Sequence, residues 1–219
     1  MRKSKIFDYG FLAFGLLVQV VTYFVSLSTF HVQHSALSLI SGLLGVCSVC
    51  LASQGNILTY VFGFGQVITY TYLCSTQRFY GEIAINAYYF VTMIYGVFVW
   101  KKRLIAQTKT ITPRRLSVPM ACALMVATLL GSWLVGWGLA EFTDDTQPYL
   151  DAFTTVPALV AQVLMILVFR EHWFIWLAVD VLSVALWLRA GDYCMVAQYA
   201  FWCANCIYGL TNWRRLERA

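Results

Sequence analysis

Eight blocks of predominantly apolar residues, separated by short polar segments, run along the chain. Each block approaches the length of about 20 residues that an α-helix needs to cross the hydrocarbon core of a bilayer. The blocks cover residues 8–29, 36–53, 56–75, 79–100, 117–139, 150–169, 172–189 and 192–212. The pattern therefore predicts an all-α membrane protein with eight transmembrane helices.

The fourth and eighth blocks repeat one another. The segment YGEIAINAYYFVTMIYGVFVWKK, from Tyr80, aligns without a gap with YCMVAQYAFWCANCIYGLTNWRR, from Tyr193, so that Trp100 coincides with Trp213. Blocks two to four and six to eight then form two triplets with a single helix between them, and both triplets enter the membrane from the same side. We therefore expect two parallel three-helix repeats in a 3+1+3 core, with a transport path between the copies.

This organisation divides the chain into four segments. Residues 1–35 are expected to form an extra N-terminal transmembrane helix, and residues 36–103 the first three-helix repeat. Residues 104–149 comprise a cytoplasmic linker and the connecting transmembrane helix. Residues 150–219 form the second three-helix repeat with a cytoplasmic tail.

Composition and charge agree with a membrane protein. The chain is 60% hydrophobic and 11% charged, whereas soluble domains carry roughly 25% charged residues. The net charge of +5 does not indicate nucleic-acid binding, because the cations occur in short runs between apolar blocks. If the N-terminus is cytoplasmic, every Lys and Arg except Arg78 and Arg189 lies on the cytoplasmic side, and the acidic segment EFTDDTQP lies outside. We therefore expect both termini in the cytoplasm.

The cysteines and histidines do not form a recognisable metal site. The CxxC pairs at 47–50 and 203–206 are embedded in apolar blocks, with no second pair or His at zinc spacing. The HxxH at His31 and His34 has no acidic third ligand nearby. We expect the cysteines to be small side chains at helix contacts, and we expect no disulfide, metal, cofactor or enzymatic activity.

The seventh block carries an acid in the middle of a predicted membrane span. Trp173, Trp176 and Asp180 are spaced so that they share one helical face. An ionisable residue at mid-membrane is costly and indicates a functional site. As alternatives, Asp180 could only hydrogen-bond a neighbouring helix, and Trp173 could anchor at the lipid interface. With one gap in the alignment of the two copies, Gln66 stands opposite Asp180.

Amide and aromatic side chains follow stripes on the fourth and eighth blocks. Asn86 and Tyr89 belong to the first stripe, and Gln198, Trp202 and Asn205 to the second. Amides are costly in lipid and should face the bundle interior. No Lys or Arg lies well inside any block, so a phosphorylated or carboxylated solute would meet no fixed cation. This inventory suits a flat ring that carries hydroxyl groups and can bear a positive charge.

Four segments carry a resemblance to a known family: GLLGVCSVCLASQGNILTYVFGFGQV, YGEIAINAYYF with the IYGVFVW that ends the same block, EHWFIWLAVDVLSV and YAFWCANCIYGLTNW. From about residue 38 to 215, except for the middle span and the acidic loop, the chain resembles the PnuC-type vitamin-precursor transporters. The most specific parts are the glycine-bearing third block, the W-x-x-W-x-x-x-polar face and the N-x-x-Y-G-x-x-x-W ending. The resemblance implies a 3+1+3 core like that of the SWEET sugar transporters, an extra N-terminal helix and a trimer.

The resemblance also implies a function. It predicts facilitated diffusion of a dephosphorylated vitamin precursor across the bacterial inner membrane, with trapping by cytoplasmic phosphorylation. Nicotinamide riboside is the expected substrate. Thiamine, riboflavin and a proton-coupled solute carrier are alternatives, followed by a membrane enzyme or structural subunit. By position, the family's site falls on Gln66, Asn86, Trp176, Asp180, Trp202 and Asn205. The acid at position 180 departs from the amide of the family pattern, and it suits a ring cation.

Together, the polar faces and the resemblance predict one set of substrate-binding residues. The set comes from the third, fourth, seventh and eighth blocks. Its members are Gln66, Asn86, Tyr89, Trp173, Trp176, Asp180, Gln198, Trp202 and Asn205.

Overall fold

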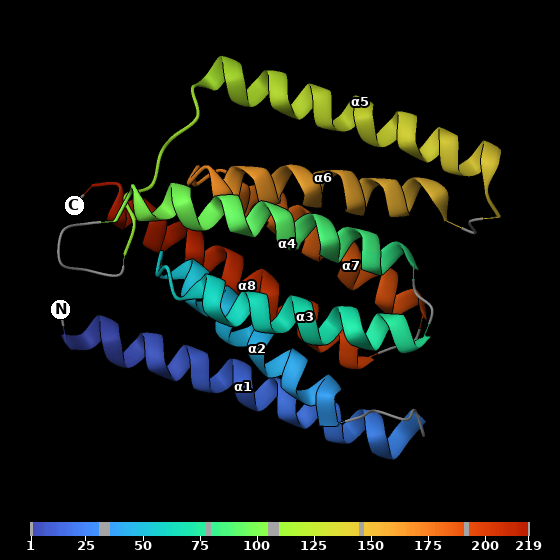
Figure 1. The fold of residues 1–219 in the computed structure, drawn as a ribbon, viewed down its shortest axis with the longest axis horizontal. Helices are drawn as coiled ribbons and strands as arrows, with labels where there is room; N and C mark the ends of the chain where they lie inside the picture. Colours follow the sequence, from blue (N-terminus) through green and yellow to red (C-terminus); the bar gives the residue numbers. More distant parts are fainter. Residues whose placement is uncertain are drawn as a thin grey trace.

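A computed structural model describes residues 2–30, 36–77, 80–104, 110–144, 147–190 and 193–218. These residues form eight α-helices, which run in alternate directions so that the two ends of the chain lie at the same end of the bundle (Figure 1). The helices are α1 (Arg2–Phe30), α2 (Ala36–Ser53), α3 (Thr59–Gln77), α4 (Tyr80–Lys101), α5 (Val118–Phe142), α6 (Pro148–Ile166), α7 (His172–Ala190) and α8 (Tyr193–Leu216).

Each predicted block corresponds to one helix, although most boundaries differ from the prediction by one to six residues. Helix α1 begins at Arg2 rather than at residue 8, because its helical hydrogen bonds extend into the polar residues that precede the apolar block. Helix α6 ends at Ile166 rather than at residue 169. The chain turns there because Val168 adopts a φ of 65°, in the left-handed region that ends a right-handed helix.

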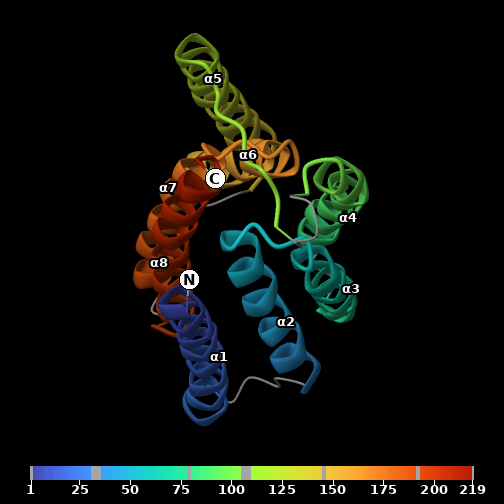
Figure 2. The same ribbon diagram turned by 90° about the vertical axis from the view of Figure 1, so that its left-hand side faces the viewer.

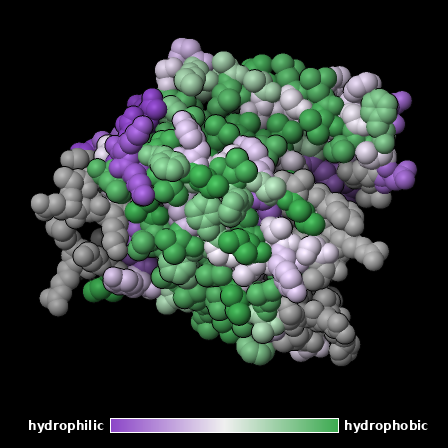
Figure 3. Space-filling view, in the orientation of Figure 1, coloured by the Kyte–Doolittle hydropathy of each residue, from purple (hydrophilic) through white to green (hydrophobic). Residues whose placement is uncertain are grey.

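Four helices are long and apolar enough to cross a membrane by length and composition: α1 through Ile6–Val25, α2, α5 and α6. The remaining four, α3, α4, α7 and α8, carry more polar side chains. Their polar residues Asn86, Asp180 and Asn205 are buried between helices, and the face seen in Figure 3 is predominantly apolar between its hydrophilic ends. This distribution is typical of a membrane bundle with a polar interior.

The helices contact one another in a regular arrangement. Helix α2 lies between α3 and α8, and α1 packs across α2 and α8 (Figure 2). Helix α4 packs on both α3 and α6, and α7 contacts α6 and α8. Among the helices of the described chain, α5 packs on α6 alone, which leaves most of its surface exposed.

The α2–α3 turn and the α6–α7 turn have the same hydrogen bonds. The amide of Gly55 donates to the carbonyl of Ala52 at 2.9 Å, and the amide of Val168 donates to the carbonyl of Met165 at 3.0 Å. Gly55 and Val168 both have a φ of 65°. They are 113 positions apart (168 − 55), which is the separation of the two copies in the sequence repeat. The sequence repeat therefore extends to the backbone of these turns.

The segment between α4 and α5, residues 110–116, contacts both turns, and we call it the strap. The amide of Ile111 donates to the carbonyl of Gly55 at 2.9 Å, and the amide of Arg114 donates to the carbonyl of Val168 at 2.7 Å. The Ile111 side chain is fully buried. The strap thus ties the two turns together at the end of the bundle where the chain begins and ends (Figure 1).

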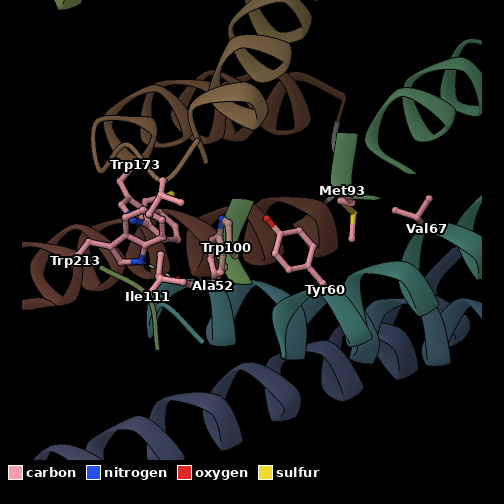
Figure 4. Close-up of a cluster of buried hydrophobic side chains, with 10 residues drawn as sticks. Ala52, Tyr60, Val67, Met93, Trp100, Ile111, Trp173 and Trp213 are labelled. Carbon is pink, nitrogen blue, oxygen red and sulfur yellow. Dashed lines mark hydrogen bonds between the residues drawn. The ribbon is translucent and has the colours of Figure 1, made fainter. Parts of the chain in front are cut away.

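Two tryptophans connect the ends of α4 and α8 to the opposite turns. The indole N–H of Trp100 donates to the carbonyl of Met165 at 3.1 Å, and that of Trp213 donates to the carbonyl of Ala52 at 2.8 Å. Both rings are fully buried in a cluster that also contains Ile111 (Figure 4). Ile111 of the strap and the aromatic cluster thus form a buried core at this end of the bundle.

Candidate functional site

Asp180 lies near the midpoint of α7 and is 4% exposed. The thiol of Cys206 on α8 donates to its Oδ2 at 3.3 Å, and Ser183, one turn further along α7, is also buried. Among the residues that the structure describes, Asp180 forms no ion pair. A carboxyl group held in an apolar bundle without a fixed cation can interact favourably with a cationic ligand.

The contact with Cys206 changes the interpretation of the second CxxC pair. We expected both of its thiols to be small apolar side chains. Instead, the Cys206 thiol is a hydrogen-bond donor to the one acid in the middle of α7. This bond joins α8 to the Asp180 carboxylate on α7.

Asn205 places an unsatisfied acceptor in the interior. The residue is 2% exposed, and its Nδ2 donates to the carbonyl of Val49 on α2 at 3.3 Å. Its Oδ1 is buried and has no hydrogen-bond partner. An unsatisfied buried polar atom costs about 1–3 kcal/mol. A ligand hydroxyl that donated to Oδ1 would remove this cost.

Trp202 lies one turn before Asn205 on α8 and supplies an unsatisfied donor. Its indole N–H is buried without a hydrogen-bond partner. The ring meets Tyr199 edge-on, with centroids 4.9 Å apart, and packs against the buried cluster of Val46, Cys50 and Phe201. Helix α8 therefore presents a donor and an acceptor one turn apart, a spacing at which the hydroxyl groups of one sugar could reach both.

A corresponding polar contact joins α4 and α6. Gln162 of α6 is buried, and its Nε2 donates to the Thr92 hydroxyl of α4 at 3.5 Å. Thr92 stands 113 positions before Asn205, and Gln162 stands 113 positions after Val49. The sequence analysis missed Gln162. The signal that could have found it is the one used for Asn86, since an amide inside an apolar block should be buried.

The remaining predicted residues of α4 and α7 lie around this interior. Asn86 is 4% exposed, and Tyr89 and Trp176 are half-buried against the central aromatic cluster. Trp173 lies at the turn end of α7, where its ring centroid is 4.5 Å from that of His172. Its indole N–H has no partner, and the ring is part of the packed core.

The predicted correspondence of Gln66 with Asp180 is wrong. Helices α3 and α7 begin at Thr59 and His172, again 113 positions apart, and no residue is inserted after the turns. The residue that corresponds to Asp180 is therefore the buried Val67. A one-residue gap would match Gln66 with Asp180, but in a continuous helix it would move every following side chain to another face.

Gln66 itself is half-buried and lies beside Gly45 of α2, where its Cγ would be 3.4 Å from an added Cβ. Among the described residues α3 and α7 share no contact, so the structure does not bring Gln66 to Asp180. Gln198 is half-buried one turn before Trp202. His31 and His34 lie outside the described residues.

Two surface cavities lie away from the interior polar residues. One, of about 450 Å³, lies between α1 and α8, and the other, of about 430 Å³, lies beside α5. None of the nine predicted residues lines either cavity. Within the described chain, no group of three His, Cys, Asp or Glu side chains could hold a metal ion. The candidate site is a set of buried and half-buried aromatic, amide and acid side chains.

Comparison with known proteins places this geometry in a family. A family model described as "Nicotinamide mononucleotide transporter" matches residues 35–215. The chain is 31% identical to the nicotinamide riboside transporter PnuC of Haemophilus influenzae, over 98% of this chain and 92% of that protein. It is 31% identical to the protein of that name from Neisseria mucosa, over 84% and 74%. A solved structure described as "Crystal structure of the Vitamin B3 transporter PnuC" superposes with a TM-score of 0.78 at 28% identity, covering 97% of this chain and 92% of that one.

Proposed function

The chain belongs to the nicotinamide mononucleotide transporter family, and on this premise we propose that it carries nicotinamide riboside across the bacterial inner membrane by facilitated diffusion. The observation that carries the proposal is Asp180, a buried carboxyl group that faces no fixed cation in the described chain. Nicotinamide riboside has a cationic pyridinium ring. Attraction between that ring and Asp180 would stabilise the bound solute, and the unsatisfied groups of Trp202 and Asn205 would bond ribose hydroxyls.

The same inventory favours the riboside over the mononucleotide. A phosphate group adds about 1.5 to 2 negative charges near neutral pH. Among the described residues, no Lys or Arg lies within the interior of the bundle to bind that phosphate, and Asp180 would repel it. A riboside that is phosphorylated in the cytoplasm would no longer fit the site, so it would be retained in the cell. Trapping by phosphorylation is therefore part of the proposal.

We further propose that α2–α4 and α6–α8 are two repeats in a 3+1+3 arrangement like that of the SWEET transporters, with α5 as the connecting helix and α1 as the extra helix. The matched turns, the reciprocal tryptophan bonds and the matched contacts of Asn205 and Gln162 support this proposal, because all of them keep one constant separation. The solute path would then run between the repeats spanning 36–103 and 150–219.

The orientation and assembly belong to the same proposal. The strap arginines lie at the end of the bundle that holds both termini (Figure 1), and the positive-inside rule then makes that end cytoplasmic. The resemblance to PnuC-type transporters leads us to propose a trimer as well. Light scattering of the purified protein, with the detergent contribution subtracted, measures the number of chains.

Uptake into proteoliposomes tests the function. We expect saturable uptake of labelled nicotinamide riboside that stops when the concentrations inside and outside are equal, and that is unchanged by a proton gradient. Nicotinamide mononucleotide should not enter, and protein-free liposomes provide the background. Uptake that requires the gradient would instead identify a proton-coupled carrier. Uptake of thiamine or riboflavin without the riboside would identify a transporter for another vitamin.

A further inference from the structure

A cavity of about 430 Å³ opens beside α5, where the strap meets the beginnings of α5 and α7 and the end of α8. We call it the α5 groove, and its wall includes Arg115, Val118, Met125, Arg170, Phe174 and Arg214. None of the predicted substrate-binding residues takes part. The groove is therefore separate from the proposed substrate-binding residues, and a ligand bound there would not be the transported solute.

The wall of the groove that runs along the helices is apolar and exposed. Val118 and Met125 of α5 are 67% and 58% exposed, and Phe174 of α7 is 49% exposed. Among the described helices, α5 packs only on α6, so this surface is not covered within the chain. In a membrane protein, such a surface faces lipid hydrocarbon.

The end of the groove at the strap is cationic. Arg115 and Arg214 come from different parts of the chain, both are exposed, and neither forms an ion pair with any residue in the described ranges. The Arg214 guanidinium lies over the Phe174 ring, 5.8 Å from its centroid, which holds the charge above the apolar wall. Arg170 is different, because Glu171 and Glu217 neutralise it.

We propose that the α5 groove binds one anionic phospholipid, with the phosphate between Arg115 and Arg214 and an acyl chain along Val118, Met125 and Phe174. The ends of membrane helices lie at headgroup depth, so the two arginines meet the phosphate at the level where a lipid carries it. Guanidinium groups bind phosphate oxygens in a bidentate manner. Basic pockets between membrane helices are typical sites for anionic headgroups.

The lipid would also contact the element that joins the two turns. Arg115 follows Arg114, whose amide donates to Val168 and whose carbonyl accepts a bond from Arg170 at 3.0 Å. The next amide, of Leu116, donates to the Glu171 carboxylate at 3.1 Å. A phosphate bound to Arg115 would therefore restrain a strap residue flanked on both sides by bonded neighbours.

Native mass spectrometry of the delipidated full-length protein tests the proposal. The protein is titrated with dioleoyl phosphatidylglycerol or dioleoyl phosphatidylcholine, and the occupancy of the first bound lipid is measured. We expect phosphatidylglycerol to bind about tenfold more tightly. The variant R115Q/R214Q should lose this preference. The matched control K101Q/K102Q removes the same charge from the exposed end of α4, outside the groove, and should keep the preference.

Two further ligands separate a lipid from a soluble anion. Dihexanoyl phosphatidylglycerol, which has short chains, should bind more weakly than the dioleoyl form, and glycerol phosphate should not displace either. Displacement by glycerol phosphate would mean that the groove binds an anion without a lipid chain, and would overturn the proposal. Equal losses in R115Q/R214Q and K101Q/K102Q would overturn it too, because they would indicate general charge attraction. A wild-type protein without a phosphatidylglycerol preference would also overturn the proposal, because the arginines would then not select an anionic headgroup.

Discussion

Trp100 and Trp213 meet near the end of the bundle with ring centroids 5.7 Å apart and ring planes at 66° to one another. The two residues occupy the same position in α4 and α8. Each donates a hydrogen bond to the turn of the opposite half, Trp100 to Met165 and Trp213 to Ala52. The rings thus hold the two halves together through one aromatic contact and two crossed hydrogen bonds.

Replacing Trp213 by Phe should destabilise the protein by about 0.5–1.5 kcal/mol, because the carbonyl of Ala52 would lose one of its two donors and keep only the Gly55 amide. Trp100→Phe should act in the same way. The stability change of the double variant should differ from the sum of the two single changes, because the two rings are in contact. Thermal unfolding in detergent provides the measurement. Trp133→Phe, at an exposed position of α5, is the control and should change little.

Gly55→Ala should destabilise the α2–α3 turn. Gly55 has a φ of 65°, and a Cβ would lie 2.7 Å from Leu216 Cδ1 and 3.3 Å from Ile111 Cγ1. The backbone cost alone is about 1–2 kcal/mol. Gly138→Ala, in α5, meets nothing within 4 Å and should be neutral or stabilising by up to about 1 kcal/mol. If the two variants unfold at the same temperature, the turn does not have this conformation in the membrane.

Asp180→Asn keeps the shape of the side chain and removes its negative charge. We expect it to weaken binding of nicotinamide riboside by about tenfold, while a neutral isostere of the ring loses much less. Calorimetric titration of both ligands into wild type and variant measures the difference. Cys206→Ser keeps a donor to Asp180 and should bind both ligands nearly as wild type does. Equal losses of affinity for the charged and the neutral ligand would show that Asp180 has a structural role and does not attract the ring cation.

Trp176→Ala should reduce affinity for nicotinamide riboside more than tenfold if the indole stacks on the pyridinium ring, because such a contact is worth about a kcal/mol or more when desolvated. Cys203→Ala, on α8, should leave the affinity for nicotinamide riboside nearly unchanged. The same titration distinguishes them. A larger loss for Cys203→Ala than for Trp176→Ala would show that the substrate faces were assigned to the wrong sides of α7 and α8.

Cysteine labelling tests the orientation. Thr112 in the strap and Thr143 after α5 are both exposed and lie at opposite ends of the bundle. In intact cells whose outer membrane has been made permeable, an impermeant maleimide should label Thr143→Cys rapidly and Thr112→Cys only after the inner membrane is opened. Cys122, an exposed native thiol, is first replaced by Ala. The reverse order would place both termini outside the cytoplasm.

The sequence predicted the helices well because bilayer thickness imposes a length on each apolar block. It indicated a sequence repeat because identical residues recur at a constant separation. The end of α6 was missed because a β-branched valine rarely adopts the left-handed conformation of Val168, and nothing in LVFRE indicates it. At the corresponding turn, by contrast, Gly55 is a residue that favours such a turn.

For the candidate site, the sequence predicted which polar side chains are buried but not what they contact, because the polarity of a side chain does not reveal its partner. The burial of Asn86, Asp180 and Asn205 followed from the cost of polar groups in lipid. The bond from Cys206 to Asp180 could not be predicted, since it depends on the rotation of α8 against α7. Trp173 was assigned to the site from its spacing, but the packing of the turn decides where its ring lies.

The crossed bonds of Trp100 and Trp213 have an implication for the origin of the chain. Exchanging the halves exchanges Trp100 with Trp213 and Ala52 with Met165, so the set of bonds is unchanged. This is the property of an isologous interface, in which the same patch serves on both sides of a two-fold axis. Two copies of one half, related by that axis, would have the residues to make both bonds. A contact of this kind can therefore arise between separate chains and persist when their genes are fused.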